Sequence, residues 1–293
     1  MRPGREEDLP AVLELWHAEV RARRQDCVPG EVHMQRLLAG FDWGARSRIV
    51  EGVNGVEAAV LVAGRPTPGG TVTQVSIAGE PPEVRHNLLR WGFDLSRAGG
   101  AVAAQVFCGR GHTEGLAELG ATFVRPWWRM DMGLTGALPD PRPVAGYQLR
   151  DGNQVAGGGW SDMHNRSFAD HWRFSPRHET ELVTGRPPRL MLMASTHAGV
   201  PAAVTLAHIE TYKDDVRLQP VGIVSSVGTV PDHRRRGLAT WLVAEALQRL
   251  HKEGAASASL YVDGWNQTRA FDAYTKLGFE LSFESEVWEA VFQ

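Results

Sequence analysis

Three consecutive arginines, Arg234, Arg235 and Arg236, stand directly before Gly237, between an apolar run and an amphipathic segment. Apolar residues at 238, 241, 242, 246 and 250, followed by Gly254, predict a helix over that segment. The first turn of a helix offers free backbone N–H groups and the positive end of its dipole to an anion. A glycine there permits close approach of the anion to the backbone. The pattern predicts a pyrophosphate site, with a solvated basic turn as the alternative. The predicted ligands are Arg234, Arg235, Arg236, Gly237, Leu238, Ala239 and Thr240.

A second group of polar residues lies downstream, in the segment YVDGWNQTRAFDAYTKLGF. The pattern predicts a strand, then Asn266, then a helix that carries Tyr274 and ends at Leu277-Gly278, where the glycine suits a helix C-cap. An ordinary phenol has a pKa of about 10, so Tyr274 is protonated at neutral pH and can donate a proton. The alternative for Tyr274 is a half-buried core residue with a solvated hydroxyl. Asn266 suits a helix start as well as a ligand contact.

Together these two segments resemble the GNAT superfamily of acyl-CoA-dependent N-acetyltransferases. Arg234, Gly237 and Ala239 match the [Q/R]xxGx[G/A] loop of that family, and the resemblance covers residues 223–281. It implies acetyl-CoA as the cosubstrate and a mixed sheet whose fourth and fifth strands splay apart to admit the pantetheine arm. It also implies that Tyr274 is the general acid for the departing thiolate. The further cofactor contacts that it implies are Val227, Gly228, Thr229 and Asn266. A glycine within a strand, as at 228, also indicates a bulge or a close backbone approach.

The chemistry implied by the resemblance is direct attack of a neutral amine on the thioester, because proximity supplies much of the acceleration without a covalent enzyme intermediate. A backbone N–H of residues 227–229 is the expected oxyanion donor. The general base is left open: Glu210 in AHIET and His171 in FADHWRF are candidates, and a water chain to a distant carboxylate serves equally. The aromatic and polar segment 168–181 fits either a specificity loop for a small polar acceptor or a cluster that anchors a domain interface.

The elements that must position these residues occur twice along the chain. Each half begins with a short strand, a polar turn and an amphipathic helix, from residues 1 and 147, and each ends with a helix that closes in Leu-Gly, at Leu119-Gly120 and Leu277-Gly278. The proline-rich segment 135–146 lacks periodicity and predicts a linker. Strands mixed with helices predict an α/β fold. We therefore expect two tandem GNAT domains, 1–134 and 147–293, each a central mixed sheet flanked by helices. This arrangement resembles that of mycothiol synthases.

The first half departs from the pattern where its own phosphate loop should lie. The segment VSIAGEPPEVRHNLLRWGF contains two prolines, and it places Glu80 and Glu83 where positive charge is expected. Acidic groups repel phosphate. The late segment GHTEGLAELG has no tyrosine. We expect residues 1–134 to keep the fold without catalysis, to pack on the second half and to wall the acceptor cleft.

Composition narrows the classes of function. A length of 293 residues suits about two domains, and the net charge of −3 disfavours broad nucleic-acid binding. Two isolated cysteines, a charged N-terminal segment and the lack of any run of about 20 apolar residues predict a cytoplasmic protein without a membrane segment. No zinc-type spacing of His and Cys occurs, so no metal is expected. The sequence predicts an N-acetyltransferase with a small polar amine as acceptor. The alternatives are a non-catalytic CoA-binding protein, a peptide or protein acceptor, and a longer acyl donor.

Overall fold

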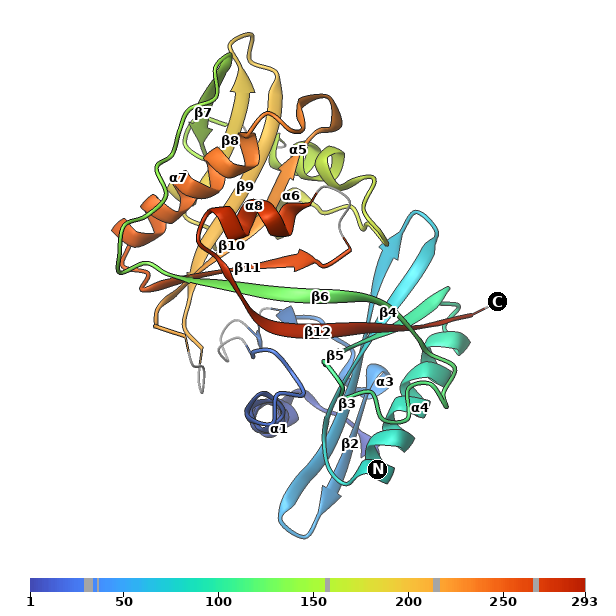
Figure 1. Ribbon diagram of the computed structural model, residues 1–293. Coiled ribbons are helices and arrows are strands. Elements are labelled where there is room, and N and C mark those ends of the chain that lie inside the picture. The colour runs from blue at the N-terminus through green and yellow to red at the C-terminus, as the bar shows by residue number, and fades with distance from the viewer. Residues whose placement is uncertain (29–33, 36, 156–158, 213–216, 266–268, 293) are drawn as a thin grey trace.

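A computed structural model describes residues 1–28, 34–35, 37–155, 159–212, 217–265 and 269–292. Its strands form one twelve-stranded mixed sheet in the order β1-β2-β3-β4-β5-β12-β6-β11-β10-β9-β8-β7 (Figure 1). The predicted α/β fold, a mixed sheet flanked by helices, is confirmed. Within the described ranges, no helix is long and apolar enough to cross a membrane.

The first half contributes six strands and three of the described helices. The strands are β1 Arg2–Pro3, β2 Ser47–Gly52, β3 Gly55–Thr67, β4 Gly70–Gly79, β5 Ala103–Gly109 and β6 Thr122–Gly133. The helices are α1 Leu9–Arg21, α3 Trp43–Arg46 and α4 Pro82–Ala98, with the 3-10 turn η1 Glu6–Asp8 before α1. The expected opening of strand, polar turn and amphipathic helix is confirmed by β1, η1 and α1.

The second half repeats this pattern. Its strands are β7 Tyr147–Asp151, β8 Met191–Thr196, β9 Pro201–Glu210, β10 Val221–Thr229, β11 Ser257–Asp263 and β12 Glu280–Val291. Its described helices are α5 Gly159–Phe168, α6 Glu179–Val183, α7 Leu238–Lys252 and α8 Ala270–Lys276, with 3-10 turns η2 Pro188–Leu190 and η3 Pro231–His233. The helix predicted from Leu238 is confirmed as α7.

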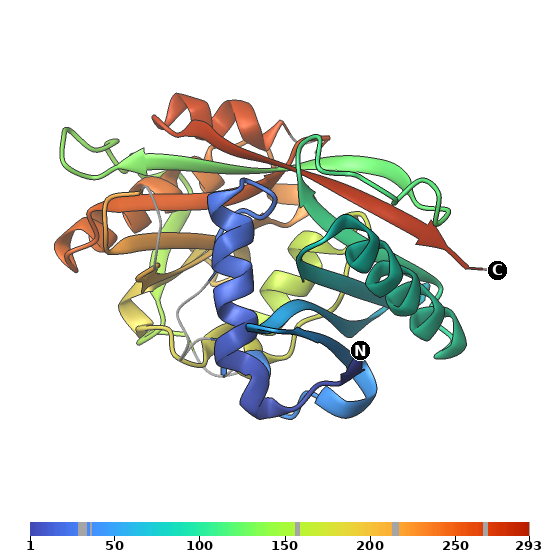
Figure 2. The ribbon, with the colours of Figure 1, turned by 90° about the horizontal axis from the view of Figure 1, so that it is seen from below.

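Each half is layered, with helices on both faces of its strands. In β3, Ala59 and Leu61 pack with α1, whereas Val60 and Val62 pack with α4 on the other face. This is the alternation that a strand buried on both faces requires. Figure 2 shows α1 and α4 on either side of the strands of the first half.

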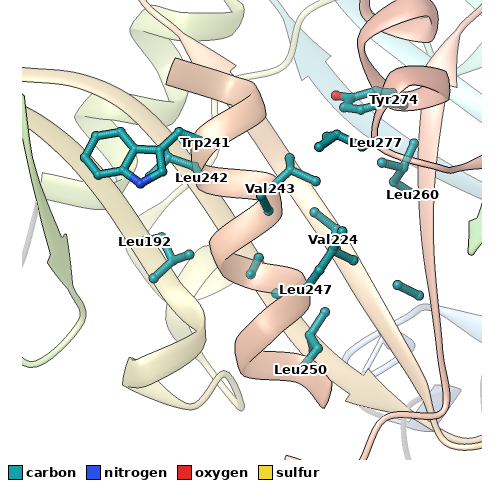
Figure 3. Packing of buried hydrophobic residues seen from close by; sticks show 14 of the residues in the cluster. Leu192, Val224, Trp241, Leu242, Val243, Leu247, Leu250, Leu260, Tyr274 and Leu277 are labelled. Carbon is teal, nitrogen blue, oxygen red and sulfur yellow. The ribbon is translucent and has the colours of Figure 1, made fainter. Parts of the chain in front are cut away.

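The second half has a face covered by α7 and a face covered by α5, which we call the α7 face and the α5 face. On β9, Ala203 and Ala207 belong to the core on the α7 face, whereas Val204 and Leu206 pack with α5 and α6. Figure 3 shows leucines of α7 directed at Val224 of β10. This core holds α7, and therefore its N-terminus, against the sheet.

The two halves exchange their last strands. β6 of the first half pairs with β11, and β12 of the second half pairs with β5. β6 and β12 also pair with each other, and they run side by side across the middle of the molecule (Figure 1). The sheet is therefore continuous from one half to the other. The division into 1–134, 135–146 and 147–293 stays a prediction.

One sequence expectation is wrong in detail. The helix expected before Leu119-Gly120 is a series of turns across residues 114–120. Gly111 and Gly115 have φ values of +82° and +76°, a left-handed conformation that does not continue a right-handed helix. In contrast, α8 ends where expected, with Gly278 at φ +97°.

Candidate active site

The loop between β10 and α7 ends at a glycine in a left-handed backbone conformation, which residues with a Cβ adopt less readily. Gly237 is the N-cap of α7 with φ +86°, and no side chain caps this end of the helix. The first intrahelical bond runs from the Trp241 N–H to the Gly237 carbonyl at 3.0 Å. The N–H groups of the preceding residues, Leu238 to Thr240, thus come before the first intrahelical donor, as in any first helical turn. Such N–H groups can bind an anion, and we call residues 237–240 the cradle.

The three arginines beside this cradle have different partners. Arg234 forms a bidentate pair with Asp170, at 2.6 and 2.8 Å, and it also donates to the carbonyls of Ser167 and Thr229, each at 3.1 Å. This guanidinium lowers the pKa of the Asp170 carboxyl. Arg236 donates to the Tyr147 hydroxyl at 3.2 Å, and Arg235 is exposed with φ +59°. Arg234 therefore joins the loop to the end of α5, while Arg235 and Arg236 remain on the surface near the cradle.

β10 and β11 separate just beyond the middle of β10. The parallel ladder runs from Val221↔Ser257 to Val224↔Leu260, and both strands continue past it. At the same point the pairing of β10 with β9 shifts register between Ser225 and Gly228. The expected bulge at Gly228 is confirmed, and the separation opens an edge of β10 that includes Val227 and the Gly228–Thr229 peptide.

Gly228 has a second structural role, because α5 ends against it. A Cβ atom at Gly228 would lie 2.7 Å from both the Phe168 ring and the Ser167 Cβ. We therefore expect Gly228→Ala to destabilise the fold by about 1–3 kcal/mol through overpacking. Urea unfolding measures this effect. Gly136→Ala is the control, since a Cβ at Gly136 meets no atom within 4 Å. Equal stability of the two variants would mean that α5 does not rest on the bulge.

Tyr274 of α8 lies on the α7 face, in the core. It is 7 % exposed, and its ring meets Phe279 edge to face with centroids 6.3 Å apart. Figure 3 shows the ring beside Leu277 and Leu260, with the hydroxyl turned to the side of α7. Burial raises the pKa of this phenol above its ordinary value, so it keeps its proton at neutral and moderately basic pH. Asn266, the other residue predicted in this segment, lies outside the described residues.

The two predicted bases, Glu210 and His171, are not neighbours of Tyr274 on its face of the sheet. Glu210 follows the even-numbered β9 residues onto the α5 face, where its carboxylate lies 3.5 Å from His208 Nε2. His171 follows α5 and packs against Phe168, with ring centroids 4.7 Å apart. Burial lowers the pKa of the His171 imidazole, which favours its neutral form. The structure therefore places the predicted acid and the predicted bases on opposite faces of the sheet.

The loop 168–174 contacts Arg234 and three strands, β3 and β6 of the first half and β12 of the second half. The Arg125 guanidinium of β6 lies over the Trp172 ring at 4.1 Å. Arg173 pairs with the buried carboxylate of Glu289 at 2.6 Å, and its carbonyl accepts from Arg65 of β3 at 2.6 Å. These contacts support the interface reading of this segment, while Asp170 in the same loop keeps it next to Arg234.

Sequence reasoning missed a polar network on the α5 face, where β6 and β11 pair. Arg129 binds Asp26 and Asp131, and Ser259 donates to Asp131 at 2.6 Å. The Tyr261 hydroxyl donates to Asp26 Oδ2 at 2.7 Å. We call these five residues the Asp26 network. A signal was present in the sequence, because Arg129/Asp131 and Ser259/Tyr261 place polar groups at alternate positions between apolar residues.

The first half contains a counterpart of the strand separation, but its own chain fills it. β4 and β5 pair over only three residues, from Val72↔Ala103 to Gln74↔Gln105. Beyond them the Gly109 N–H donates to the Arg24 carbonyl at 2.8 Å, and the Gln25 amide reaches the Phe107 carbonyl at 3.5 Å. The remaining cavity of about 20 Å³ is far below the roughly 300–1,000 Å³ of ligand pockets.

A buried carboxylate also stands behind the loop that follows β4. Glu19, 1 % exposed, accepts from the Gly79 N–H at 3.1 Å, from Arg85 at 3.0 Å and from Arg24 at 2.9 Å. Glu80 adds a further pair with Arg24 at 2.9 Å. The arginines and the N–H group that could bind a phosphate here are therefore already paired with protein carboxylates.

Comparison with known proteins supports the assignment of the second half. The sequence model of the acetyltransferase (GNAT) family matches residues 146–279. A mycothiol acetyltransferase of Corynebacterium aurimucosum is 31 % identical over 170 residues, covering 53 % of this chain and 56 % of that protein. One of Thermobispora bispora is 31 % identical over 173 residues, covering 56 % of each. The chain thus spans about half the length of the curated relatives it matches.

Solved structures share the fold of the whole chain. A GCN5-related N-acetyltransferase from Sphaerobacter thermophilus superposes with a TM-score of 0.78 at 20 % identity, covering 98 % of this chain and 94 % of that one. A tandem GNAT protein from the clavulanic acid biosynthesis pathway gives a TM-score of 0.69 at 16 % identity, covering 99 % and 97 %. Residues 146–279 therefore match the model of the GNAT family of acetyltransferases, and the whole chain shares its fold with solved structures of GNAT proteins.

Proposed function

We propose that this protein transfers the acetyl group of acetyl-CoA to the amine of a small polar molecule, by direct attack of the amine on the thioester. The observation that carries the proposal is the coincidence of two features at one end of β10. An uncapped helix N-terminus with Gly237 suits a diphosphate, and the adjacent strands separate after Val224 and Leu260. The names of the curated relatives, mycothiol acetyltransferases, support an acceptor of small-molecule size.

In this proposal the cosubstrate supplies an activated acyl group. The residues of the chain hold the cosubstrate and protonate the departing thiolate. The N–H groups of residues 238–240 with Arg235 and Arg236 hold the diphosphate. The edge of β10 at 227–229, beyond the last rung of its ladder with β11, offers backbone groups to the pantetheine arm and the acyl oxygen. Asn266 is a further proposed contact to that arm.

Proton transfer completes the reaction. The amine nitrogen forms the new C–N bond, the C–S bond breaks, and the amine loses a proton to a base. Tyr274 donates its proton to the departing thiolate in this scheme; burial keeps the phenol protonated, although the raised pKa also makes it a weaker acid. His171 and Glu210 stay predictions as the base.

A thiol-release assay tests the proposal. Acetyl-CoA is offered with glucosamine, putrescine, amino-acid amides and a lysine peptide, and each product is checked by mass spectrometry. We expect acetylation of a small amine and no acetylation of the peptide. If the peptide alone is acetylated, the acceptor class is wrong.

A second measurement separates catalysis from binding. Calorimetry with CoA measures the affinity of the folded protein. Tight CoA binding without acetylation of any amine in the panel would favour the non-catalytic alternative and contradict the proposed reaction. Turnover with a longer acyl-CoA but not with acetyl-CoA would mean that the acyl donor is the longer thioester and that acetyl-CoA is the wrong donor.

A further inference from the structure

The segment that fills the first half's strand separation continues directly onto the second half. Arg24 and Gln25 bond to β5, and the next two residues, Asp26 and Cys27, lie against β11 and β6. Cys27 packs against the cluster of Tyr212, Val221 and Ile223 on the second half. The filled gap in the first half therefore anchors a short segment that places a carboxylate on the α5 face of the other half.

The partner of that carboxylate lies at the point where β10 and β11 separate. Tyr261 is the first residue of β11 after the last rung, Leu260, of its ladder with β10. Leu260 and Val262 belong to the core on the α7 face, so Tyr261 between them faces the α5 side. Its hydroxyl donates to Asp26 Oδ2 at 2.7 Å and lies 3.2 Å from Cys27 Sγ.

Glu210 is farther from this point along the sheet. It is paired with Val221 at the start of β10, three rungs before Val224. At about 3.3 Å per residue, that row lies roughly 10 Å from the place where the strands part. The Asp26–Tyr261 pair lies next to the place where the strands part.

We propose that Asp26, supplied by the first half, takes up the proton of the acceptor amine through the hydroxyl of Tyr261. The inference rests on the proposed function. As the C–N bond forms, the Tyr261 oxygen accepts the proton from the amine nitrogen and passes its own proton to Asp26 Oδ2. Asp26 ends as the neutral acid and Tyr261 is again a phenol, so the protons balance. Asp26 is a positioning residue in this scheme, because it acts through Tyr261.

The charges around Asp26 are compatible with this role. Arg129 and Asp131 face it from β6, Tyr261 from β11 and Arg217 from the segment before β10, with Cys27 beside it. The two arginines lower the pKa of the Asp26 carboxyl, but burial outweighs them and raises it. The base works in its ionised form, so kcat should fall as pH decreases through this raised pKa.

Asp26→Asn tests the relay, because it keeps the shape and removes the proton acceptor. We measure kcat at saturating acetyl-CoA with the panel amine that the wild type acetylates fastest, from pH 5 to 9. We expect kcat to fall by about 10²-fold and the acid limb of the profile to disappear, with CoA affinity by calorimetry unchanged. Tyr261→Phe should give a similar loss, and the double variant should add less than about threefold, since the two residues act as a unit.

Asp131→Asn is the matched control. It also loses a bond to Arg129, but the Tyr261 hydroxyl donates to Asp26 and not to Asp131, so we expect kcat on the plateau within about threefold of wild type. The acid limb should be retained and move to lower pH, because Asp131 no longer raises the pKa of Asp26. Equal losses in the Asp26 and Asp131 variants would show a purely structural network and overturn the inference. So would an Asp26→Asn variant with wild-type kcat and acid limb, or one that changes only the KM of the amine. A wild type that acetylates no panel amine would instead contradict the proposed function, and the inference with it.

Discussion

Replacing Tyr274 by phenylalanine should lower kcat by about 10²–10⁴-fold, the usual contribution of a general acid or base. The hydroxyl is the proposed proton source for the thiolate, and the buried ring has the same packing in both residues. The KM for the amine and the affinity for CoA should stay within about threefold of the wild-type values, since the change acts on the transition state. Steady-state kinetics and calorimetry provide the three measurements.

Tyr212→Phe is a matched control for this prediction. Tyr212 is also buried in the second half, 9 % exposed, but it belongs to a separate small cluster with Val221 and Ile223. Its variant should keep kcat within about threefold. A Tyr274→Phe enzyme with undiminished kcat would remove Tyr274 from the proposed chemistry and leave it as a core residue.

The largest expected loss of stability comes from Glu19→Ala. The change removes the buried carboxylate that Arg85, Arg24 and the Gly79 N–H share; Arg24 keeps its pair with Glu80, whereas Arg85 loses its carboxylate partner. Removing one partner of a buried ion pair costs about 3–5 kcal/mol, because the remaining charge is uncompensated. Urea unfolding of the full chain, followed by circular dichroism, should show a decrease of this size in the free energy of unfolding.

Glu51→Ala provides the comparison for an exposed ion pair in the same half. The Glu51 side chain is 56 % exposed and pairs with Arg2 at 2.9 Å. Such pairs contribute about 0–1 kcal/mol because water screens them. If the Glu19 variant loses no more stability than the Glu51 variant, the buried carboxylate does not hold the first half together.

Local patterns in the sequence predicted the elements around the cradle. The apolar spacing from Leu238 predicted α7, and the strand glycine predicted the bulge at Gly228. These features depend on a few neighbouring residues, so periodicity and turn chemistry suffice to find them. The prediction of a helix at 111–120 was wrong, because periodicity does not reveal that Gly111 and Gly115 adopt left-handed backbone conformations.

Contacts between distant segments could not be predicted in this way. The Arg234 guanidinium pairs with Asp170, 64 positions earlier in the chain, while its role as a phosphate ligand stays a prediction. The Asp26–Tyr261 bond joins residues 235 positions apart. Neither pairing leaves a periodic trace, because each depends on where the sheet places the two segments.

The exchange of β6 and β12 has a consequence for synthesis on the ribosome. β5 lacks its neighbour on one side until residues 280–291 have been made, because that neighbour is β12. Domains generally fold in order as they emerge. Here the sheet of the first half keeps an unpaired edge at β5 until β12 of the second half has been made. A stalled or truncated translation product that ends before residue 280 would therefore expose β5 to pairing with other chains.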